Sequence, residues 1–338
     1  MSIQPSPSPD RIMQLISGGW STAILGSAAR HGIFNALDGD GGDARNVAAR
    51  CGISERGAQA ELDGLTGLGL LTFSNGKYRN TAESAAFLVK GKPAYFGGMA
   101  EVMTGSLTDW ATLPEAVRTG NPTAASTAEM ADNEFWHLLV PAIAAMSQPT
   151  AQMVADKLGI AKAGAVRWLD VGGGSGIWSA VWLTANPQGT GVQLDWPKVN
   201  SIAKDFVGKF SASGNFPVSN FQTIDGDFHT VDFGSGKYDF AIYGHIAHQE
   251  SPDSNVAIFR KFRKALKPGG TLVINDFVLN DDRMGHPFAM MFASQMLLVS
   301  GGGNAWTQAH YRSWLTEAGF TSISFVATPS PATIVLAQ

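Results

Sequence analysis

The sequence predicts a doubly wound α/β sheet with an antiparallel edge hairpin, preceded by a mainly helical domain. Strand-like and helix-like segments alternate from about residue 160, which is the pattern of a parallel sheet covered by helices. Residues 43–89 read instead as two short helices and a hairpin. A length of 338 residues suggests about two domains, and 44% hydrophobic against 15% charged residues is enough for packed cores.

The composition of the chain limits the kinds of partner that we expect. The net charge of −4 gives no general attraction for nucleic acid or anionic lipid, so we expect neither partner. The single cysteine, Cys51, excludes an internal disulfide and a zinc site of several thiolates, which fits an expected cytoplasmic location. The apolar stretch 15–29 is too short and too polar to span a bilayer. Its helical spacing predicts an amphipathic helix that has little core of its own to cover it.

The early part of the chain has a winged-helix pattern. Asp43 and Ser54 are placed to cap two helices, and Ser74-Asn75-Gly76 is a strong hairpin turn between two short strands. A transcription regulator is one interpretation of this pattern. However, the second helix carries more acidic than basic side chains, and the phosphates of a DNA groove would repel it.

Residues 101–155 are predicted to be helices that link this part to the sheet. They carry Trp110, Trp136 and Met146, and aromatic and methionine side chains form the walls of sites for flat apolar ligands. The apolar helical run 288–299 contains Met291, which we expect to belong partly to core and partly to a pocket wall.

The predicted sheet is built from strands that alternate with helices along the chain. Strands are predicted at 166–171, 190–194, 221–224, 238–243 and 271–275, with a closing hairpin at 321–327 and 332–337. Helices are predicted at 176–185, 200–210 and 254–266. Ligands in such sheets bind at the carboxyl ends of the strands, so the residues that follow each strand are the candidates for a site.

The first strand ends at Asp170 and runs into a glycine-rich turn. Gly172, Gly174 and Gly176 follow, and a helix begins directly after them. Such a turn lets a ligand approach the backbone at the positive end of the helix. The dinucleotide fingerprint would need its third glycine one position later, where Ile177 stands.

Two further strand ends offer carboxylates. Asp195 closes the second strand and could accept both hydroxyls of a ribose, although an ordinary helix cap would use the same residue. Asp227 follows the third strand and could accept from an adenine amine, with Phe228 covering the ring. A plain acidic turn is the alternative.

The fourth and fifth strands add titratable groups. His245 and His248 both follow the fourth strand, and a histidine facing the cleft is a candidate general base because its ordinary pKa is near neutral. Asp276 ends the fifth strand beside them. No cluster of histidines and carboxylates has the sequence spacing of a metal site, so no metal is expected.

Together these segments resemble the S-adenosylmethionine (SAM) dependent O-methyltransferases of the plant and bacterial small-molecule type. The resemblance rests on 169–176, 194–197, 226–228, His248 before 267–270, and 301–303 before Trp306-Thr307. It implies a winged-helix dimerisation domain at 1–100, linking helices at 101–155 that contribute to the substrate pocket, and a Rossmann-like catalytic domain at 156–338. It therefore also implies a homodimer.

The resemblance implies roles for the residues at the strand ends. Gly172 and Gly174 would hold the methionine part of SAM, Asp195 the ribose, and Asp227 with Phe228 the adenine. His248 would be the general base, with Asp276 as its carboxylate partner. The acceptor would be a hydroxyl of a small, flat, mostly apolar, aromatic secondary metabolite.

The chain departs from the family pattern at two places. His248 is followed by Gln249-Glu250 where the family has Asp-Trp, and Ala305 stands where the family has a second acidic partner for the histidine. A base with one carboxylate partner is less well oriented. The alternatives of C-methylation, or of changed chemistry with SAM retained, therefore stay open.

Overall fold

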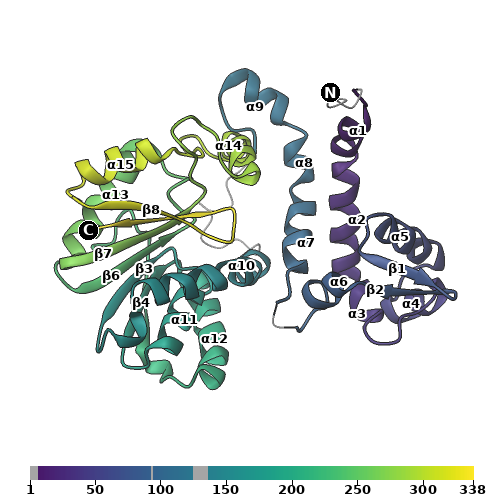
Figure 1. Ribbon diagram of the computed structural model, residues 1–338, viewed down its shortest axis with the longest axis horizontal. Coiled ribbons are helices and arrows are strands. Elements are labelled where there is room, and N and C mark those ends of the chain that lie inside the picture. Colours follow the sequence, from purple (N-terminus) through teal and green to yellow (C-terminus); the bar gives the residue numbers. More distant parts are fainter. Residues whose placement is uncertain (1–6, 93, 125–135) are drawn as a thin grey trace, which may run out of the picture. The chain divides into compact units, whose positions relative to one another are not determined.

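The computed structural model describes residues 7–92, 94–124 and 136–338, with the side chains of 136–138, 141 and 142 left out. The chain divides into two compact units, Met1–Thr108 and Asp109–Gln338 (Figure 1). No described helix is both long enough and apolar enough to cross a membrane.

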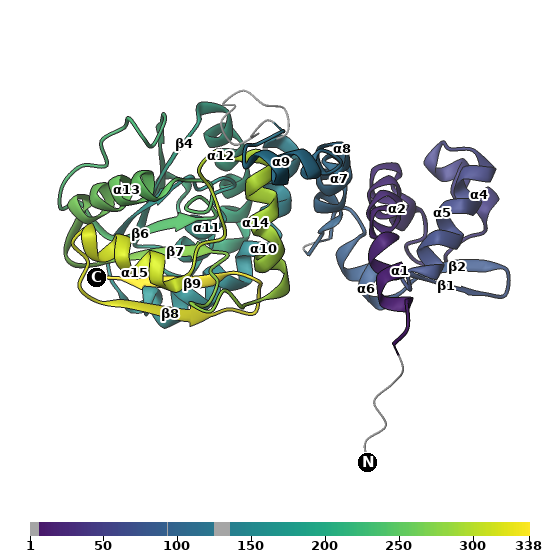
Figure 2. The ribbon, with the colours of Figure 1, turned by 90° about the horizontal axis from the view of Figure 1, so that it is seen from above.

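The first unit is mainly helical, as expected. Its elements are α1 (Asp10–Ile16), α2 (Gly18–His31), α3 (Ile33–Ala36), α4 (Ala44–Cys51), α5 (Glu55–Gly67), β1 (Leu71–Ser74), β2 (Lys77–Asn80), α6 (Ala82–Phe87) and α7 (Gly97–Gly105). The short helix α8 (Leu107–Trp110) crosses the division between the units. Figure 2 shows the β1–β2 hairpin beside α4 and α5.

Local signals in the first unit act as the sequence predicts. Asp43 caps α4 by accepting from the Asn46 N–H at 2.8 Å, and Ser54 caps α5 by accepting from the Gly57 N–H at 3.0 Å. Asn75 and Gly76 have φ of 51° and 73°, the left-handed conformation that a two-residue hairpin turn requires. The winged-helix pattern of the sequence is confirmed.

Helices α1 and α2 leave a row of apolar side chains uncovered within the first unit. No residue of α1 is buried. Ile12, Leu15 and Ile16 of α1 are exposed, and Trp20 of α2 is 74% exposed. Exposed apolar surface of this kind marks a binding surface more often than chance.

The second unit contains a sheet of seven strands in the order β5-β4-β3-β6-β7-β9-β8. The strands are β3 (Arg167–Val171), β4 (Thr190–Asp195), β5 (Phe221–Asp225), β6 (Tyr238–Gly244), β7 (Leu266–Asp276), β8 (Ile323–Ala327) and β9 (Thr333–Ala337). The first five are parallel, whereas β9 pairs antiparallel with both β7 and β8. The predicted doubly wound sheet with an antiparallel edge is confirmed.

Helices cover both faces of this sheet. The described helices of the second unit are α9 (Leu113–Thr119), α10 (Trp136–Lys157), α11 (Ile177–Ala185), α12 (Pro197–Gly214), α13 (Pro252–Ala265), α14 (Pro287–Val299) and α15 (Gln308–Glu317), with two 3₁₀ turns at Ile160–Lys162 and Val218–Asn220. Figure 1 shows α13 and α15 above the strands and α10, α11 and α12 below them.

Alternation along the strands builds a core on each face. Leu169 and Val171 of β3 pack into one cluster with the aromatic rings of α13, whereas Trp168, the residue before Leu169, packs into the other cluster with Trp182 of α11. Strand order reverses between β3 and β6, because β4 and β5 lie on one side of β3 and β6 lies on the other. Ligands of such sheets bind in the crevice at this reversal.

Candidate active site

A cavity of about 370 Å³ lies at the carboxyl ends of β3, β4, β5 and β6. Its lining includes Asp170 and the turn 172–175, Asp195 and Trp196, residues 226–229, and residues 244–246 with Gln249 and Glu250. Apolar side chains of α10 and the ring of Trp178 close the remainder. Seven of the predicted strand-end residues therefore surround one space, whereas His248 and Asp276 are not among its lining residues.

The glycine turn after β3 exposes backbone to the cavity. Gly172 and Gly174 have φ of 66° and 58°, which disfavours any side chain there. A Cβ on Gly172 would also lie 2.8 Å from the side chain of Ile246, whereas the space beside Gly174 is open. The turn thus leaves an uncovered surface against which a ligand can lie.

Asp195 is tied to that turn from the neighbouring strand. Its Oδ2 accepts from the Gly174 N–H at 2.9 Å, and its Oδ1 accepts from the Trp196 N–H at 2.8 Å. Burial raises the pKa of Asp195 to about 6, although these two N–H groups act in the opposite direction. The N-cap residue of α12 is Trp196, whose side chain makes no capping hydrogen bond, and both N–H groups that Asp195 accepts from lie outside this helix.

Asp170 lies beneath the turn with an unmet hydrogen-bonding need. The side chain is buried, and its Oδ2 has no partner within the described part of the chain. Burial, together with the nearby charge of Asp195, raises the pKa of Asp170 to about 8. A buried carboxyl oxygen of this kind is stabilised by a ligand that brings a hydrogen-bond donor or a positive charge.

The second histidine after β6 is held firmly by Asp276 at the end of β7. His248 is 5% exposed, and its Nδ1 lies 2.5 Å from Asp276 Oδ1. The His248 backbone N–H donates to Asp276 Oδ2 at 2.9 Å. An ionised carboxylate can only accept, so Nδ1 carries the proton, and Nε2 of the neutral ring keeps a free lone pair. That is the arrangement of a general base with an orienting carboxylate.

Asp276 is stabilised as an anion despite complete burial. Burial alone would raise its pKa. The adjacent His248 ring and the hydrogen bonds from His248 and the Phe277 N–H outweigh burial, so the pKa of Asp276 lies below its usual value. Tyr311 of α15 adds a further donor, since its hydroxyl lies 3.1 Å from Asp276 Oδ2.

Sequence reasoning missed Tyr311. No local motif in the sequence marks it as a partner of Asp276. The structure buries it completely, and burial together with Asp276 raises the pKa of its phenol well above the ordinary value. Tyr311 therefore remains a neutral donor to the carboxylate.

His245 lines the cavity but is poorly suited to be the base. Its Nε2 lies 3.1 Å from the Asn275 side-chain amide, and its buried Nδ1 has no partner among the residues described. Burial lowers the pKa of His245 to about 4, so the ring is neutral and only weakly basic at neutral pH. His248 has a carboxylate partner, and His245 does not.

The tertiary structure also assembles a group that sequence spacing did not show. Ligand-type atoms of His245, His248 and Asp276 lie within 4.8 Å of one another. Asp276 and His248 Nδ1 already hydrogen-bond to each other, and His245 is paired with Asn275. We interpret the group as a hydrogen-bonded network and assign it no ion.

Comparison with known proteins shows the family of this chain. An O-methyltransferase domain model matches residues 110–321, and an O-methyltransferase dimerisation domain model matches residues 13–90.

The chain belongs to the O-methyltransferase family.

Two curated relatives extend over almost the whole chain of this methyltransferase. It is 32% identical over 332 residues to the 3-hydroxy-5-methyl-1-naphthoate 3-O-methyltransferase of Streptomyces sahachiroi, which covers 96% of this chain and 92% of the relative. It is 29% identical to the tetracenomycin polyketide synthesis 8-O-methyltransferase of Streptomyces glaucescens, over 98% of this chain and 96% of the relative. The protein is a SAM-dependent methyltransferase.

A solved structure shares the fold of this methyltransferase. Human N-acetylserotonin methyltransferase in complex with SAM is 23% identical, with 99% of each chain covered and a TM-score of 0.84.

The segment of the methyltransferase that contains the glycine run 301–303 contacts the segment that carries His248. Ser300 donates its hydroxyl to the Gln249 carbonyl at 3.0 Å, and the Asn304 N–H donates to the His248 carbonyl at 2.8 Å. A Cβ on Gly303 would lie 2.4 Å from the His248 carbonyl oxygen. Only glycine therefore allows the two segments to lie this close.

The remaining predicted pocket residues lie elsewhere. Trp110 and Met146 are half-buried and do not line the cavity, and Met291 of α14 is 62% exposed and does not line it either. The side chain of Trp136 lies outside the described residues. Ala305 is buried in an apolar cluster with Phe277 and Phe292, so it offers His248 no second polar partner.

Proposed function

We propose that this methyltransferase transfers the methyl group of SAM to a hydroxyl of a small, flat, mostly apolar aromatic secondary metabolite, with His248 as general base. The observation that carries the proposal is the His248–Asp276 pair, which engages Nδ1 and leaves Nε2 without a hydrogen bond to any described residue. The two Streptomyces relatives, whose names describe methylation of a hydroxynaphthoate and of a tetracenomycin precursor, support a fused aromatic acceptor.

The residues around the cavity fit SAM. Asp170 offers a buried carboxyl oxygen without a partner, and the open backbone at Gly174 offers a surface for an extended ligand. Asp195 would hold the ribose hydroxyls, and Asp227 with Phe228 would hold the adenine. When bound, SAM supplies a methyl group on a sulfonium, which is already a good leaving group.

The protein's own residues then have little chemistry to perform. His248 would accept the proton of the acceptor hydroxyl on Nε2, so that the oxygen could displace the sulfur from the methyl carbon of bound SAM. Asp276 stays ionised and stabilises the imidazolium that forms. The rest of the rate comes from holding the oxygen in line with the methyl group.

Aromatic side chains beside His248 support a flat acceptor. Phe292 lies edge-on to the His248 ring with centroids 4.7 Å apart, and Phe277 lies 4.5 Å from Phe292. Phe288 stacks near Phe292 at 6.0 Å. Rings arranged in this way favour offset or edge contacts with another aromatic ring.

We also propose that residues 1–100 form a homodimer, that 101–155 contribute to the acceptor pocket and that 156–338 bind SAM. The match of residues 13–90 to a dimerisation domain supports this, as do the exposed apolar side chains of α1 and α2. Replacing Ile16 and Trp20 by glutamate should give a monomer in light scattering. Gln14→Glu, a change at an exposed residue of the helix that carries Ile16, should leave the dimer intact.

The catalytic proposal is tested by incubating the protein with SAM and hydroxylated naphthalenes and anthraquinones. We expect demethylated SAM and a methyl ether product, and no turnover with the matching O-methylated compounds. Methyl found on a ring carbon would instead support C-methylation, for which the lone carboxylate partner of His248 leaves room. Binding of SAM without turnover on any phenol would contradict the proposed reaction.

A further inference from the structure

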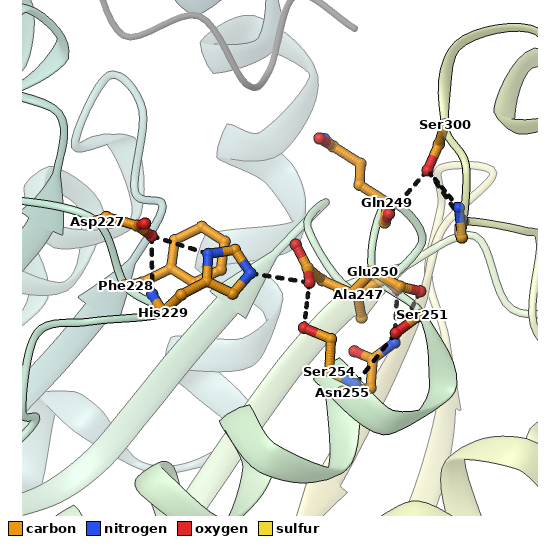
Figure 3. Close-up of polar contacts among 12 residues, drawn as sticks. Asp227, Phe228, His229, Ala247, Gln249, Glu250, Ser251, Ser254, Asn255 and Ser300 are labelled. Carbon is orange, nitrogen blue, oxygen red and sulfur yellow. Dashed lines mark hydrogen bonds and ion pairs between the residues drawn. The ribbon is translucent and has the colours of Figure 1, made fainter. Parts of the chain in front are cut away.

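The side chain of His229 joins two loops at the cavity. It follows β5, and its Nδ1 lies 2.8 Å from Asp227 Oδ1 on its own loop. Its Nε2 lies 3.0 Å from Glu250 Oε2, on the loop that follows β6 (Figure 3). All three residues line the cavity. One imidazole therefore spans two carboxylates from different parts of the sheet edge.

This bridge requires a charged imidazole. Ionised carboxylates only accept hydrogen bonds, so both ring nitrogens must donate, and only the imidazolium has two N–H groups. Burial disfavours the charge, but the hydrogen bonds to Glu250 and Asp227 outweigh it, and the pKa of His229 is raised.

Lys261 of α13 is a second cation beside this loop. Its ammonium donates to the carbonyls of Phe228 at 2.5 Å and His229 at 3.0 Å. Lys261 therefore holds the backbone of the loop and leaves the two carboxylates to His229. The Ser254 hydroxyl donates to Glu250 Oε2, the same oxygen that faces His229.

The bridge also fixes how Asp227 is turned. Asp227 Oδ1 accepts from both the backbone N–H of His229, at 2.8 Å, and Nδ1 of the ring. Oδ2 of Asp227 makes no hydrogen bond with the described residues and remains available to a ligand. The His229 ring packs on Phe228 with centroids 4.3 Å apart and planes inclined by 33°.

We propose that His229, as an imidazolium, is a positioning residue that holds Asp227 with its free oxygen ready for the exocyclic amine of the cofactor's adenine. This rests on the proposed assignment of Asp227 to the adenine. Glu250 stands where the family pattern has tryptophan, so the bridge is a feature of this chain's own sequence.

The first test is His229→Gln, with affinity measured by calorimetry for S-adenosylhomocysteine and for S-inosylhomocysteine, which lacks the amine. His229→Gln should weaken binding of the adenosyl compound about three- to tenfold, because the site is half exposed and solvent screens its ion pairs. The inosyl compound should lose little, because it has no amine for Asp227 to accept from. Loss of general structure would instead weaken both ligands alike.

The second test asks whether the effect of His229 depends on the charge of its imidazole. The ratio of the affinities of wild type and His229→Gln should approach one as the pH rises from about 6.5 to about 9.5, because wild type then loses its imidazolium. Titration of other groups, Asp170 included, is common to both proteins and cancels in this ratio. His229→Arg keeps two donors and a permanent charge, and should retain the advantage at the high pH.

The possible outcomes distinguish the positioning role of His229 from the proposed cofactor assignment. His229→Gln/Glu250→Gln should bind no worse than His229→Gln alone, since both changes break the same bridge. His31→Gln, an exposed histidine of the first unit, should change nothing. Equal losses for both ligands, or a ratio independent of pH, would overturn the positioning role. Failure of wild type to bind S-adenosylhomocysteine would instead overturn the cofactor assignment.

Discussion

The Tyr311 hydroxyl donates to Asp276 Oδ2 at 3.1 Å, on the carboxylate that also holds His248. The hydroxyl stabilises the anion and helps to fix the direction of the carboxylate. With Ala305 in the place of a second acidic partner, Tyr311 supplies part of the orientation that the histidine would otherwise lack.

Tyr311→Phe should therefore slow turnover without altering cofactor affinity. A lost hydrogen bond to a charged group costs roughly 1.5–3 kcal/mol, which corresponds to about tenfold or more in rate. The less stabilised carboxylate should also hold the His248 ring less firmly in one direction, so the loss should appear in kcat. Tyr243→Phe, which removes a buried hydroxyl without a described partner, is the matched control. Turnover of Tyr311→Phe equal to that of Tyr243→Phe would contradict the role.

Replacement of His248 should abolish most turnover. Losing a positioned base typically costs about 10²–10⁴-fold. His248→Gln is preferable to alanine, because alanine would leave the buried Asp276 without its partner and destabilise the fold. Asp276→Asn should give a similar loss. S-adenosylhomocysteine affinity and the unfolding temperature serve as controls, and near-full activity of His248→Gln on the true acceptor would disprove the base.

Asp195→Ala should weaken binding of SAM. The loss expected is about 1.5–3 kcal/mol, the range for hydrogen bonds to a charged group. The variant also frees the Gly174 N–H that Asp195 now satisfies, so the glycine turn should become less ordered. Asp205→Ala, an exposed carboxylate on α12, is the control. Calorimetry that finds equal affinities for the two variants would rule out the assignment.

The raised pKa of Asp170 predicts a linkage between protons and cofactor. In the unfolded chain this carboxyl has its ordinary pKa near 3.8, and in the free folded protein the pKa is about 8. The folded state therefore binds the extra proton, and stability should fall as the pH rises through this window.

A ligand carrying a positive charge favours the ionised carboxyl. SAM binding at neutral pH should therefore release a proton, which calorimetry in buffers of different ionisation enthalpy can count. Asp170→Asn should release fewer protons and show a flatter dependence of unfolding temperature on pH. Equal proton release by wild type and variant would count against Asp170 as the group that titrates.

Gly303→Ala should disturb the His248 segment through packing alone. The new Cβ would lie 2.4 Å from the His248 carbonyl and 3.0 Å from the Gln249 Cα, and backbone atoms cannot yield cheaply. Overpacking of this kind costs about 1–3 kcal/mol of stability, and activity should fall with it. Gly301→Ala adds a methyl group with no atom within 4 Å and should behave as wild type.

Much of the fold follows from local sequence. The caps at Asp43 and Ser54, the Asn75-Gly76 turn and the alternation of strand and helix after residue 160 all match the structure, because each depends on contacts within a few residues. The sequence also predicted which residues meet at one cavity, because the carboxyl ends of neighbouring parallel strands lie at one edge of the sheet. These residues are Asp170, Gly172, Gly174, Asp195, Asp227 and Phe228.

Contacts between elements that are distant in the sequence were decided only by the tertiary structure. Tyr311 reaches Asp276 and His229 reaches Glu250 through contacts between separate elements, and the direction of a side chain depends on packing that no spacing reveals. The same reason explains why Met291, on a helix that is apolar almost throughout, lies exposed and away from the cavity. Of the two histidines after β6, only the fold shows that His248 meets a carboxylate, because β7 places Asp276 beside it.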